Sequence, residues 1–352
     1  MTADAAQPEP SQRRGPLTLS ETIGLGVVLL TTFCVGFVPL FGGPGYEYAL
    51  ACGLILPGCV AGSAALSAAR SARPYSSAVL RGVALGMAAS GIAVLTTSIH
   101  GARVGFCSPL QGFSLLLMGP LAGAVLAGVW GALVGSLLHP VIGKKRAVLA
   151  VFAGIAAPLL TIAISLWRFY SSPIIFAFDP FVGFFAGALY DTVISGFDRL
   201  VTYRFGSLGS LLAVWALAQQ LHSPAEGRLR PRWRSWRWSN GCWMALGLLL
   251  SGGITLRGPE LGHFQTAATI AAALGGQQAA QRCEVIHSRE MLKRDVALLA
   301  RDCDAHVEAI EKYLGTRGPA RIRVYLFNGA QQKGWLMGAA NTYIAKPWRN
   351  EI

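Results

Sequence analysis

The residues best suited to chemistry in a water-poor setting lie in one mostly apolar stretch, 168–204. Within it stand Asp179, Tyr190 and Asp191. Ionisable groups in an apolar setting near a membrane are candidates for contact with an ion or a polar substrate, because they are costly to keep there without a partner. The alternative is that these groups cap turns or anchor the stretch at the membrane interface, and both hypotheses stay open for the three residues.

No histidine lies in a pattern that would bind a metal ion. A zinc site of the HExxH type needs two histidines four residues apart on a helix, with a glutamate beside the first to polarise the metal-bound water. His263, His287 and His306 all lack this pattern, and the residue four positions after His306 is Ile310. We therefore predict no catalytic residue, no metal site and no cofactor within this chain.

Two of the seven cysteines, Cys283 and Cys303, are predicted to form a disulfide. Both fall in the more polar C-terminal part, and Cys303 lies on the apolar stripe of a predicted helix that can reach the strand containing Cys283. Disulfides persist in oxidising compartments, which is where the topology argued below places this part. Two buried free thiols are the alternative.

Long apolar helices must position all of these residues. The chain has 352 residues, of which 53% are hydrophobic and 13% are charged, about half the charged fraction of an ordinary soluble domain. Apolar runs of about 17–25 residues, the length that crosses a bilayer, recur up to residue 256. We predict an all-α polytopic membrane bundle of about seven transmembrane helices within 22–256, at 22–41, 47–69, 78–98, 113–138, 147–167, 205–221 and 241–256.

Lysine and arginine residues indicate the orientation of these helices. They concentrate in the tail 1–21 and in the loops on its side, above all in the basic loop 222–240. The more basic side of a membrane protein faces the cytoplasm, so we expect a cytoplasmic N-terminus in the cytoplasmic (inner) membrane of a bacterium. The net charge of +13 then serves orientation and lipid contact, and we predict no nucleic-acid partner.

This orientation requires 168–204 to lie at the outer face as an interfacial or re-entrant segment. If the stretch crossed the membrane instead, the basic loop 222–240 would lie outside, against the charge rule. With an odd number of spans, everything after residue 256 is extracytoplasmic. We expect a linking helix over 257–281, followed by a small, incomplete α+β domain over 282–352.

The order of elements predicted in 282–352 is strand, long helix, strand, short helix and a closing strand. It resembles the N-terminal half of the gluzincin zinc metallopeptidase domain, in the peptidase MA-like branch related to thermolysin. Ile322, Val324 and Leu326 match the I-x-V-x-L strand of that family, and the run GAANTYIAKPWRNEI at 338–352 is similar to the segment that brings in its edge strand. The resemblance implies that Asn341 and Tyr343 lie near the path of a bound peptide.

Two functional hypotheses follow. In the first, the chain is the membrane-anchored, non-catalytic N-terminal part of a zinc metallopeptidase, truncated and inactive as given, with Zn²⁺ expected only if a further C-terminal part carries HExxH. Its partners would be the lipid bilayer and a peptide or protein substrate outside the membrane. In the second, the chain is a multispan transporter or sensor whose small outer domain binds a ligand or a partner.

Overall fold

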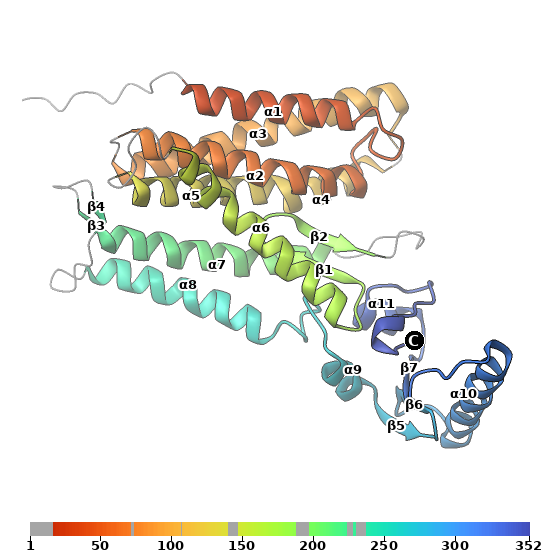
Figure 1. Ribbon diagram of the computed structural model, residues 1–352. Coiled ribbons are helices and arrows are strands. Elements are labelled where there is room, and N and C mark those ends of the chain that lie inside the picture. The colour runs from red at the N-terminus through yellow and green to blue at the C-terminus, as the bar shows by residue number, and fades with distance from the viewer. Residues whose placement is uncertain are drawn as a thin grey trace, which may run out of the picture.

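The computed structural model describes residues 17–71, 74–106, 108–139, 147–187, 197–223, 228–229 and 237–352. Within them the chain forms a long helical bundle and a small region of sheet towards the C-terminus (Figure 1). The prediction of a mainly helical chain with a small sheet is confirmed. In chain order the elements are α1 (Leu19–Val35), α2 (Tyr46–Arg70), α3 (Tyr75–Val104), α4 (Pro109–Leu116), η1 (Leu117–Leu121), α5 (Ala122–Leu138), α6 (Ala147–Ser171), β1 (Phe176–Asp179), β2 (Gly183–Ala186), α7 (Phe197–Leu221), β3 (His222–Ser223), β4 (Arg228–Leu229), α8 (Trp238–Leu256), α9 (Ala267–Leu274), β5 (Gly275–Ala279), β6 (Cys283–Ser288), α10 (Lys293–Leu314), β7 (Ile322–Leu326), α11 (Ala330–Met337) and η4 (Pro347–Arg349).

The apolar segments predicted as spans are helical where the structure describes them, except that the first, 22–41, is helical only to Val35 and continues as turns. Helix α1 is apolar but only 17 residues long, and α8 has 19 residues. Among the described residues, five helical segments are long and apolar enough to cross a membrane: Tyr46–Arg70, Tyr75–Val104, Pro109–Leu138, Val148–Ser171 and Phe197–Gln220.

Small residues bring α2, α3 and α5 into direct backbone contact. A Cβ atom added at Gly82 of α3 would lie 2.2 Å from the carbonyl oxygen of Gly128 on α5. A Cβ atom at Gly131 of α5 would lie 2.3 Å from the carbonyl oxygen of Ala61 on α2. No side chain fits at such distances, so these glycines are what lets the three helices pack so closely.

A buried ion pair fastens α1 to this group of helices. The Glu21 carboxylate is 1% exposed and accepts from both Nε and Nη2 of Arg81 on α3, each at 2.6 Å. Ser67 of α2 donates to the same carboxylate at 2.9 Å. We predicted that residue 21 closes a cytoplasmic tail, but it lies in the first turn of α1 and joins three helices.

The bundle is not purely helical, contrary to the all-α prediction. In the described part of 168–204, α6 ends at Ser171, strands β1 and β2 form an antiparallel hairpin, and α7 begins at Phe197. The tip of the hairpin enters the bundle. A Cβ atom at Gly123 of α5 would lie 1.7 Å from the carbonyl oxygen of Phe181, so the tip occupies space that a larger residue would fill.

The C-terminal region contains a three-stranded sheet with the order β5-β6-β7. Strands β5 and β6 pair antiparallel, while β6 and β7 pair parallel and are connected by α10. The predicted Cys283–Cys303 disulfide is present and links β6 to α10. Only the first half of the predicted apolar stripe of α10 packs well, since Val296 is 1% exposed whereas Ile310 is 56% exposed.

The predicted linking helix over 257–281 is wrong in its extent. Helix is limited to α9, and 275–279 forms strand β5, which pairs with β6. Gly275 adopts a left-handed conformation (φ 75°) that ends the helix. Gly275 and Gly276 both disfavour helix, and the backbone groups of 275–279 bond to β6 instead.

The closing run 341–352 is not the continuous edge strand that we expected. Its residues 347–349 form a single 3₁₀ turn, because Pro347 lacks an N–H group and Asn350 is left-handed (φ 53°). Only the last residues run beside β7: the N–H of Arg323 donates to Asn350 O at 2.8 Å, and the N–H of Ile352 donates to Arg323 O at 2.9 Å.

Candidate ligand-binding site

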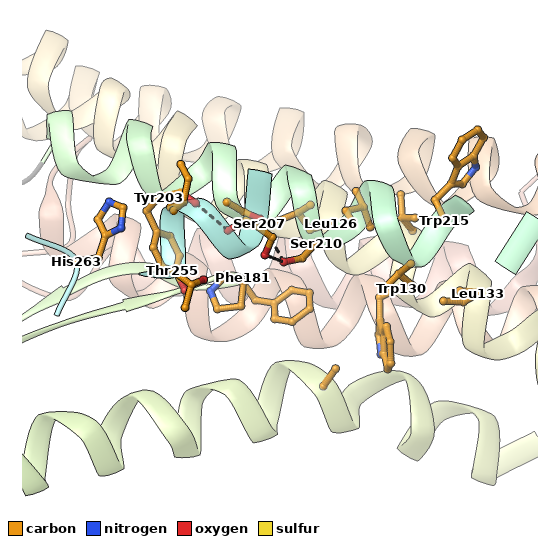
Figure 2. A pocket seen from close by; sticks show the side chains of 18 of the residues that line it. Leu126, Trp130, Leu133, Phe181, Tyr203, Ser207, Ser210, Trp215, Thr255 and His263 are labelled. Carbon is orange, nitrogen blue, oxygen red and sulfur yellow. Dashed lines mark hydrogen bonds between the residues drawn. The ribbon is translucent and has the colours of Figure 1, made fainter. Parts of the chain in front are cut away.

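A cavity of about 380 Å³ lies between α5, α6, α7 and α8. Figure 2 shows its side chains in the space between α6, drawn yellow-green, and α7, drawn green. Its size falls in the range of about 300–1,000 Å³ that is usual for small-molecule sites. It is lined by Tyr75, Leu126, Val129, Trp130, Leu133, Ala157, Arg168, Pro180, Phe181, Tyr203, Gly206, Ser207, Ser210, Leu211, Val214, Trp215, Ser251, Ile254, Thr255, His263 and Phe264.

The walls of this cavity are mostly apolar, and the polar groups follow one side. Ser210 of α7 and Ser251 of α8 share a hydrogen bond of 2.6 Å between their hydroxyl oxygens. Ser210, Val214 and Thr255 are exposed, so the cavity is open to the surroundings on this side. None of the residues that line it is an aspartate or a glutamate.

His263 closes one end of the cavity and is held as a hydrogen-bond donor. Its Nε2 lies 2.8 Å from Thr202 Oγ1 and 3.1 Å from the carbonyl oxygen of Arg199. The carbonyl can only accept, so Nε2 carries the proton. Burial lowers the pKa of His263, which keeps the ring neutral. A histidine that donates to Thr202 cannot act as the base that would activate this hydroxyl, so the pair is not a nucleophilic dyad.

Arg168 stands at the same end, in the last turn of α6. Its side chain is exposed, and its guanidinium carbon lies 6.0 Å from the centre of the Phe264 ring. Among the described residues it has no ion pair and no side-chain hydrogen bond. The cavity therefore ends at a cation for which the described residues supply no anion.

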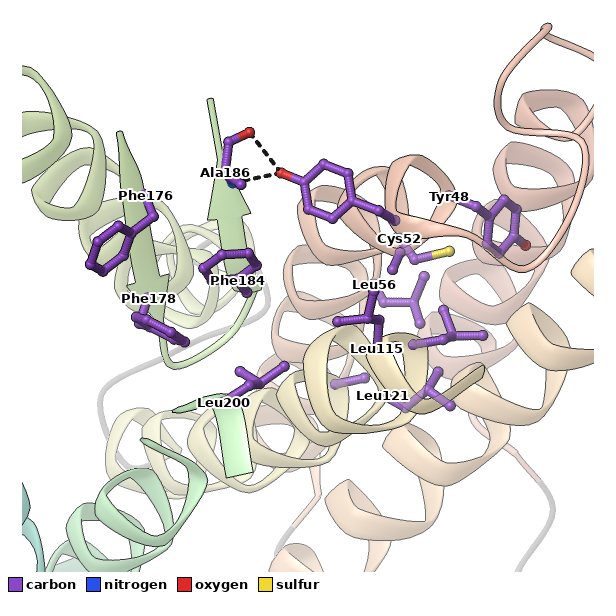
Figure 3. Close-up of a cluster of buried hydrophobic side chains, with 14 of the residues drawn as sticks. Tyr48, Cys52, Leu56, Leu115, Leu121, Phe176, Phe178, Phe184, Ala186 and Leu200 are labelled. Carbon is purple, nitrogen blue, oxygen red and sulfur yellow. Dashed lines mark hydrogen bonds between the residues drawn. The ribbon is translucent and has the colours of Figure 1, made fainter. Parts of the chain in front are cut away.

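The hairpin that forms part of the wall is held by aromatic packing. Phe176, Phe178 and Phe184 are buried between the hairpin and the helices, with Leu200 of α7 beneath them (Figure 3). Across the hairpin from α7, the Tyr46 hydroxyl accepts from the N–H of Ala186 at 2.7 Å and donates to its carbonyl oxygen at 3.2 Å. These contacts fix the hairpin against both α2 and α7.

Asp179 caps the turn of this hairpin. Its Oδ1 accepts from the N–H groups of Phe181 and Val182, both at 2.8 Å, and its Oδ2 accepts from the Ser165 hydroxyl of α6 at 3.1 Å. The geometry favours the capping hypothesis, because these donors engage both oxygens and Asp179 does not line the cavity. Tyr190 and Asp191 lie outside the described residues.

Arg204 of α7 binds a break in the α4–α5 helix. At Gly119 the backbone leaves helical geometry (φ −87°, ψ −106°), and Pro120 follows without an N–H group. Arg204 is 5% exposed and donates to the carbonyl oxygens of Met118, Gly119 and Pro180. A charged side chain thus supplies the donors that the interrupted helix lacks, and it ties the hairpin tip to the break.

The closing segment of the chain is hydrogen-bonded to the end of α6. Lys346 is 3% exposed, and its Nζ donates to the carbonyl oxygens of Phe169, Ser172 and Ile174 at 2.6, 2.8 and 2.6 Å. Burial, with a smaller effect of Arg349, lowers the pKa of Lys346 to about 8. A cation among the last carbonyls of a helix is also favoured by the helix dipole.

Two further side chains add contacts between the closing segment and α6. Trp348 stacks on Tyr170 with ring centroids 4.8 Å apart, and its Nε1 donates to Tyr170 O at 3.0 Å. Arg349 donates to the carbonyl oxygen of Ser171. The segment NTYIAKPWRNEI therefore docks on the bundle, next to a second contact in which the N–H of Ile175 donates to Met337 O at 2.9 Å.

The predicted substrate-binding residues do not join the cavity. Tyr343 is 96% exposed, with Lys333 Nζ 4.9 Å above its ring, and Asn341 is also exposed. Neither residue lines the cavity. In the described part of the chain no three His, Cys, Asp or Glu side chains gather in a way that could hold a metal ion.

Sequence reasoning missed Arg204, Lys346 and the cavity. A Gly-Pro pair inside an apolar run signals a broken helix that needs outside donors, and this signal was available at Gly119 and Pro120. The cavity has no such signal, because its residues come from five helices, the hairpin turn and the segment after α8. Comparison with protein-family models, curated proteins and solved structures gave no match to this chain.

Proposed function

We propose that this chain is a multispan membrane protein in which α1, α2, α3, the broken α4–α5 helix, α6, α7 and α8 make seven crossings. The N-terminus is cytoplasmic and the domain 282–352 is extracytoplasmic. Three observations support the proposal. Five helical segments have the required length and composition. The C-terminal end of α2 and the N-terminal end of α3, helices that carry Arg70 and Arg81 near these ends, lie at the end of the bundle opposite the domain (Figure 1). The Cys283–Cys303 disulfide suits an oxidising compartment.

Within this topology, the protein acts as a sensor in which the outer domain responds to a ligand in the cavity. The observation that carries this function is the position of α6. It lines the cavity with Ala157 and Arg168, and Lys346 of the outer domain donates to Phe169 O in its last turn and to two carbonyl oxygens just after it. His263 and Phe264 at the end of the cavity also belong to the connection that leads into α9 and β5.

The test is hydrogen–deuterium exchange of residues 346–352 in the full chain, reconstituted in lipid nanodiscs. Ala157→Trp fills the cavity and pushes on α6, and we expect faster exchange at 346–352. Ala156→Trp is the matched control, because Ala156 is the neighbouring exposed residue and does not line the cavity. Equal exchange in the two variants would contradict the proposed coupling.

A second candidate, the metallopeptidase-like protein, is favoured by one observation. The outer domain has the order β6, α10, β7 and α11, with the final residues beside β7, as the resemblance implies. Under this proposal the domain is the non-catalytic half of a zinc hydrolase. Reading the coding frame beyond Ile352 tests it: an HExxH helix supports the proposal, and a stop codon with no such helix nearby contradicts it.

A further inference from the structure

The cavity combines an apolar interior with a cation at one end. Trp130, Leu133, Leu211 and Trp215 belong to its apolar walls, and Arg168 stands at the end where the hairpin and His263 close it. Since none of the lining residues is an acidic one, the site favours a ligand whose polar part is anionic. Arginine is well suited to such a group, because its planar guanidinium can make two parallel hydrogen bonds to a carboxylate or a phosphate.

The surroundings of the cavity indicate where this ligand comes from. On α6, Leu159, Leu160 and Ile164 are 61%, 61% and 43% exposed, as expected for side chains that face lipid. The exposed lining residues Ser210, Val214 and Thr255 show that the cavity opens to the same surroundings. A ligand from the bilayer can therefore enter sideways with its chain still in an apolar medium.

Two buried arginines near this end do not compete for the anion. Arg204 is occupied by three carbonyl oxygens. Arg199 is 8% exposed, lies between the Phe176 and Trp335 rings, and donates to Trp335 O. Their positive charges add to the potential at Arg168 without offering a free guanidinium.

We propose that the cavity binds an acyl chain of an anionic lipid drawn from the surrounding bilayer, with the lipid headgroup on Arg168. The inference rests on the proposed membrane topology and names the ligand class of the sensor. The acyl chain lies along Phe181, Leu211 and Trp215, while the headgroup stays at the outer end of α6. Because α6 connects the cavity with Lys346, a lipid bound here is in a position to set how firmly the outer domain is held.

The experiment uses quenching of tryptophan fluorescence in the full chain, reconstituted with lipids whose acyl chains carry bromine. Trp130 and Trp215 line the cavity, so a brominated chain inside it quenches them. The quenching that is lost in the Trp130→Phe/Trp215→Phe double variant is the cavity signal. We expect brominated phosphatidylglycerol to give this signal at a lower mole fraction than brominated phosphatidylcholine.

Arg168→Gln removes the charge, and we expect it to shift the phosphatidylglycerol curve to about tenfold higher mole fraction, the effect of losing one charge-assisted contact. Arg257→Gln is the matched control, because Arg257 is an exposed arginine at the end of α8 and does not line the cavity. If Arg168→Gln does not fold, Ala157→Phe serves as a second variant, and it should abolish the cavity signal while Arg168 stays in place.

Three results would overturn the inference. They are identical curves for the two lipids, an unchanged curve in Arg168→Gln, and displacement of the cavity signal by inorganic phosphate, which would indicate a soluble anion. The readout is binding and does not involve the outer domain. A lipid that binds without changing exchange at 346–352 would therefore disprove the sensor function and leave the lipid site intact.

Discussion

Two parts of the bundle are packed in opposite ways. Between α2, α3 and α5, glycine and alanine let backbones touch, with Gly82 against Gly128 and Gly131 against Ala61. Between α5, α6 and the α7–α8 pair, large side chains such as Trp130 and Trp215 meet and leave a cavity of about 380 Å³. The α7–α8 pair is itself closely packed at Gly209 and Gly247. The cavity follows from the placement of small and large residues on α5. The face of α5 towards α2 and α3 packs closely, whereas the face towards α6 and α7 does not.

The largest expected effect breaks the close-packed part. Gly82→Leu places side-chain atoms where the Gly128 carbonyl oxygen lies, 2.2 Å from the new Cβ. Overpacking usually costs about 1–3 kcal/mol, and a backbone obstacle cannot move away, so we expect loss of the folded bundle. Gly91→Leu, on the same helix with nothing within 4 Å, is the control. Size-exclusion profiles and thermal unfolding in detergent measure the difference, and equal behaviour of both variants would contradict close packing.

A smaller effect is expected where the loosely packed part depends on polar contacts. Arg204→Met keeps most of the side-chain volume but leaves the carbonyl oxygens of Met118, Gly119 and Pro180 without their donor. An unsatisfied buried polar group costs about 1–3 kcal/mol, and we expect a loss of that order in unfolding free energy.

Arg204→Lys provides the control for this prediction. Lysine keeps the charge and one set of donors, so we expect it to recover part of the lost stability. Denaturant unfolding in detergent micelles measures both variants. If Arg204→Met unfolds at the same denaturant concentration as the unchanged chain, Arg204 does not stabilise the break.

The smallest effect concerns the contact between the loosely packed part and the C-terminal domain. The pKa of Lys346 is lowered to about 8 in the docked state, against about 10.4 for a free lysine. At a pH between these two values, Lys346 is more protonated in the undocked state than in the docked state. Docking therefore strengthens as the pH rises through this window, because the charge that is costly to bury is lost. We expect exchange at 346–352 to slow correspondingly, after correction for the intrinsic pH dependence of exchange.

Lys346→Arg tests this assignment, because arginine does not titrate in the same window. The variant should show no pH dependence of docking between the two pKa values. A pH dependence that persists unchanged in Lys346→Arg would assign the effect to another group.

The sequence predicted the helices and the cysteine pair, but not the features that depend on contacts between several elements. The apolar runs predicted the positions of the helices, and the stripe on α10 brought Cys303 within reach of Cys283. The hairpin β1–β2 was not predicted, since its residues are as apolar as a span and only Asp179 and Pro180 interrupt them. The closing run has strand-like residue types, but Lys346 and Trp348 find better partners at the end of α6 than in a sheet.

The sequence by itself determined the local properties of this protein. They are the apolar helices, the breaks at Gly119–Pro120 and Gly275, and the cysteine pair, because length, hydropathy and backbone preference act over a few residues. Only the tertiary structure decided that Glu21 pairs with Arg81, that Arg204 satisfies a broken helix, and that a cavity ends at Arg168. The contacts of Glu21 and Arg204 join residues 24 to 86 positions apart. The cavity is formed by more than two helices. Their energies depend on burial and on the partners available, which exist only once the helices have packed.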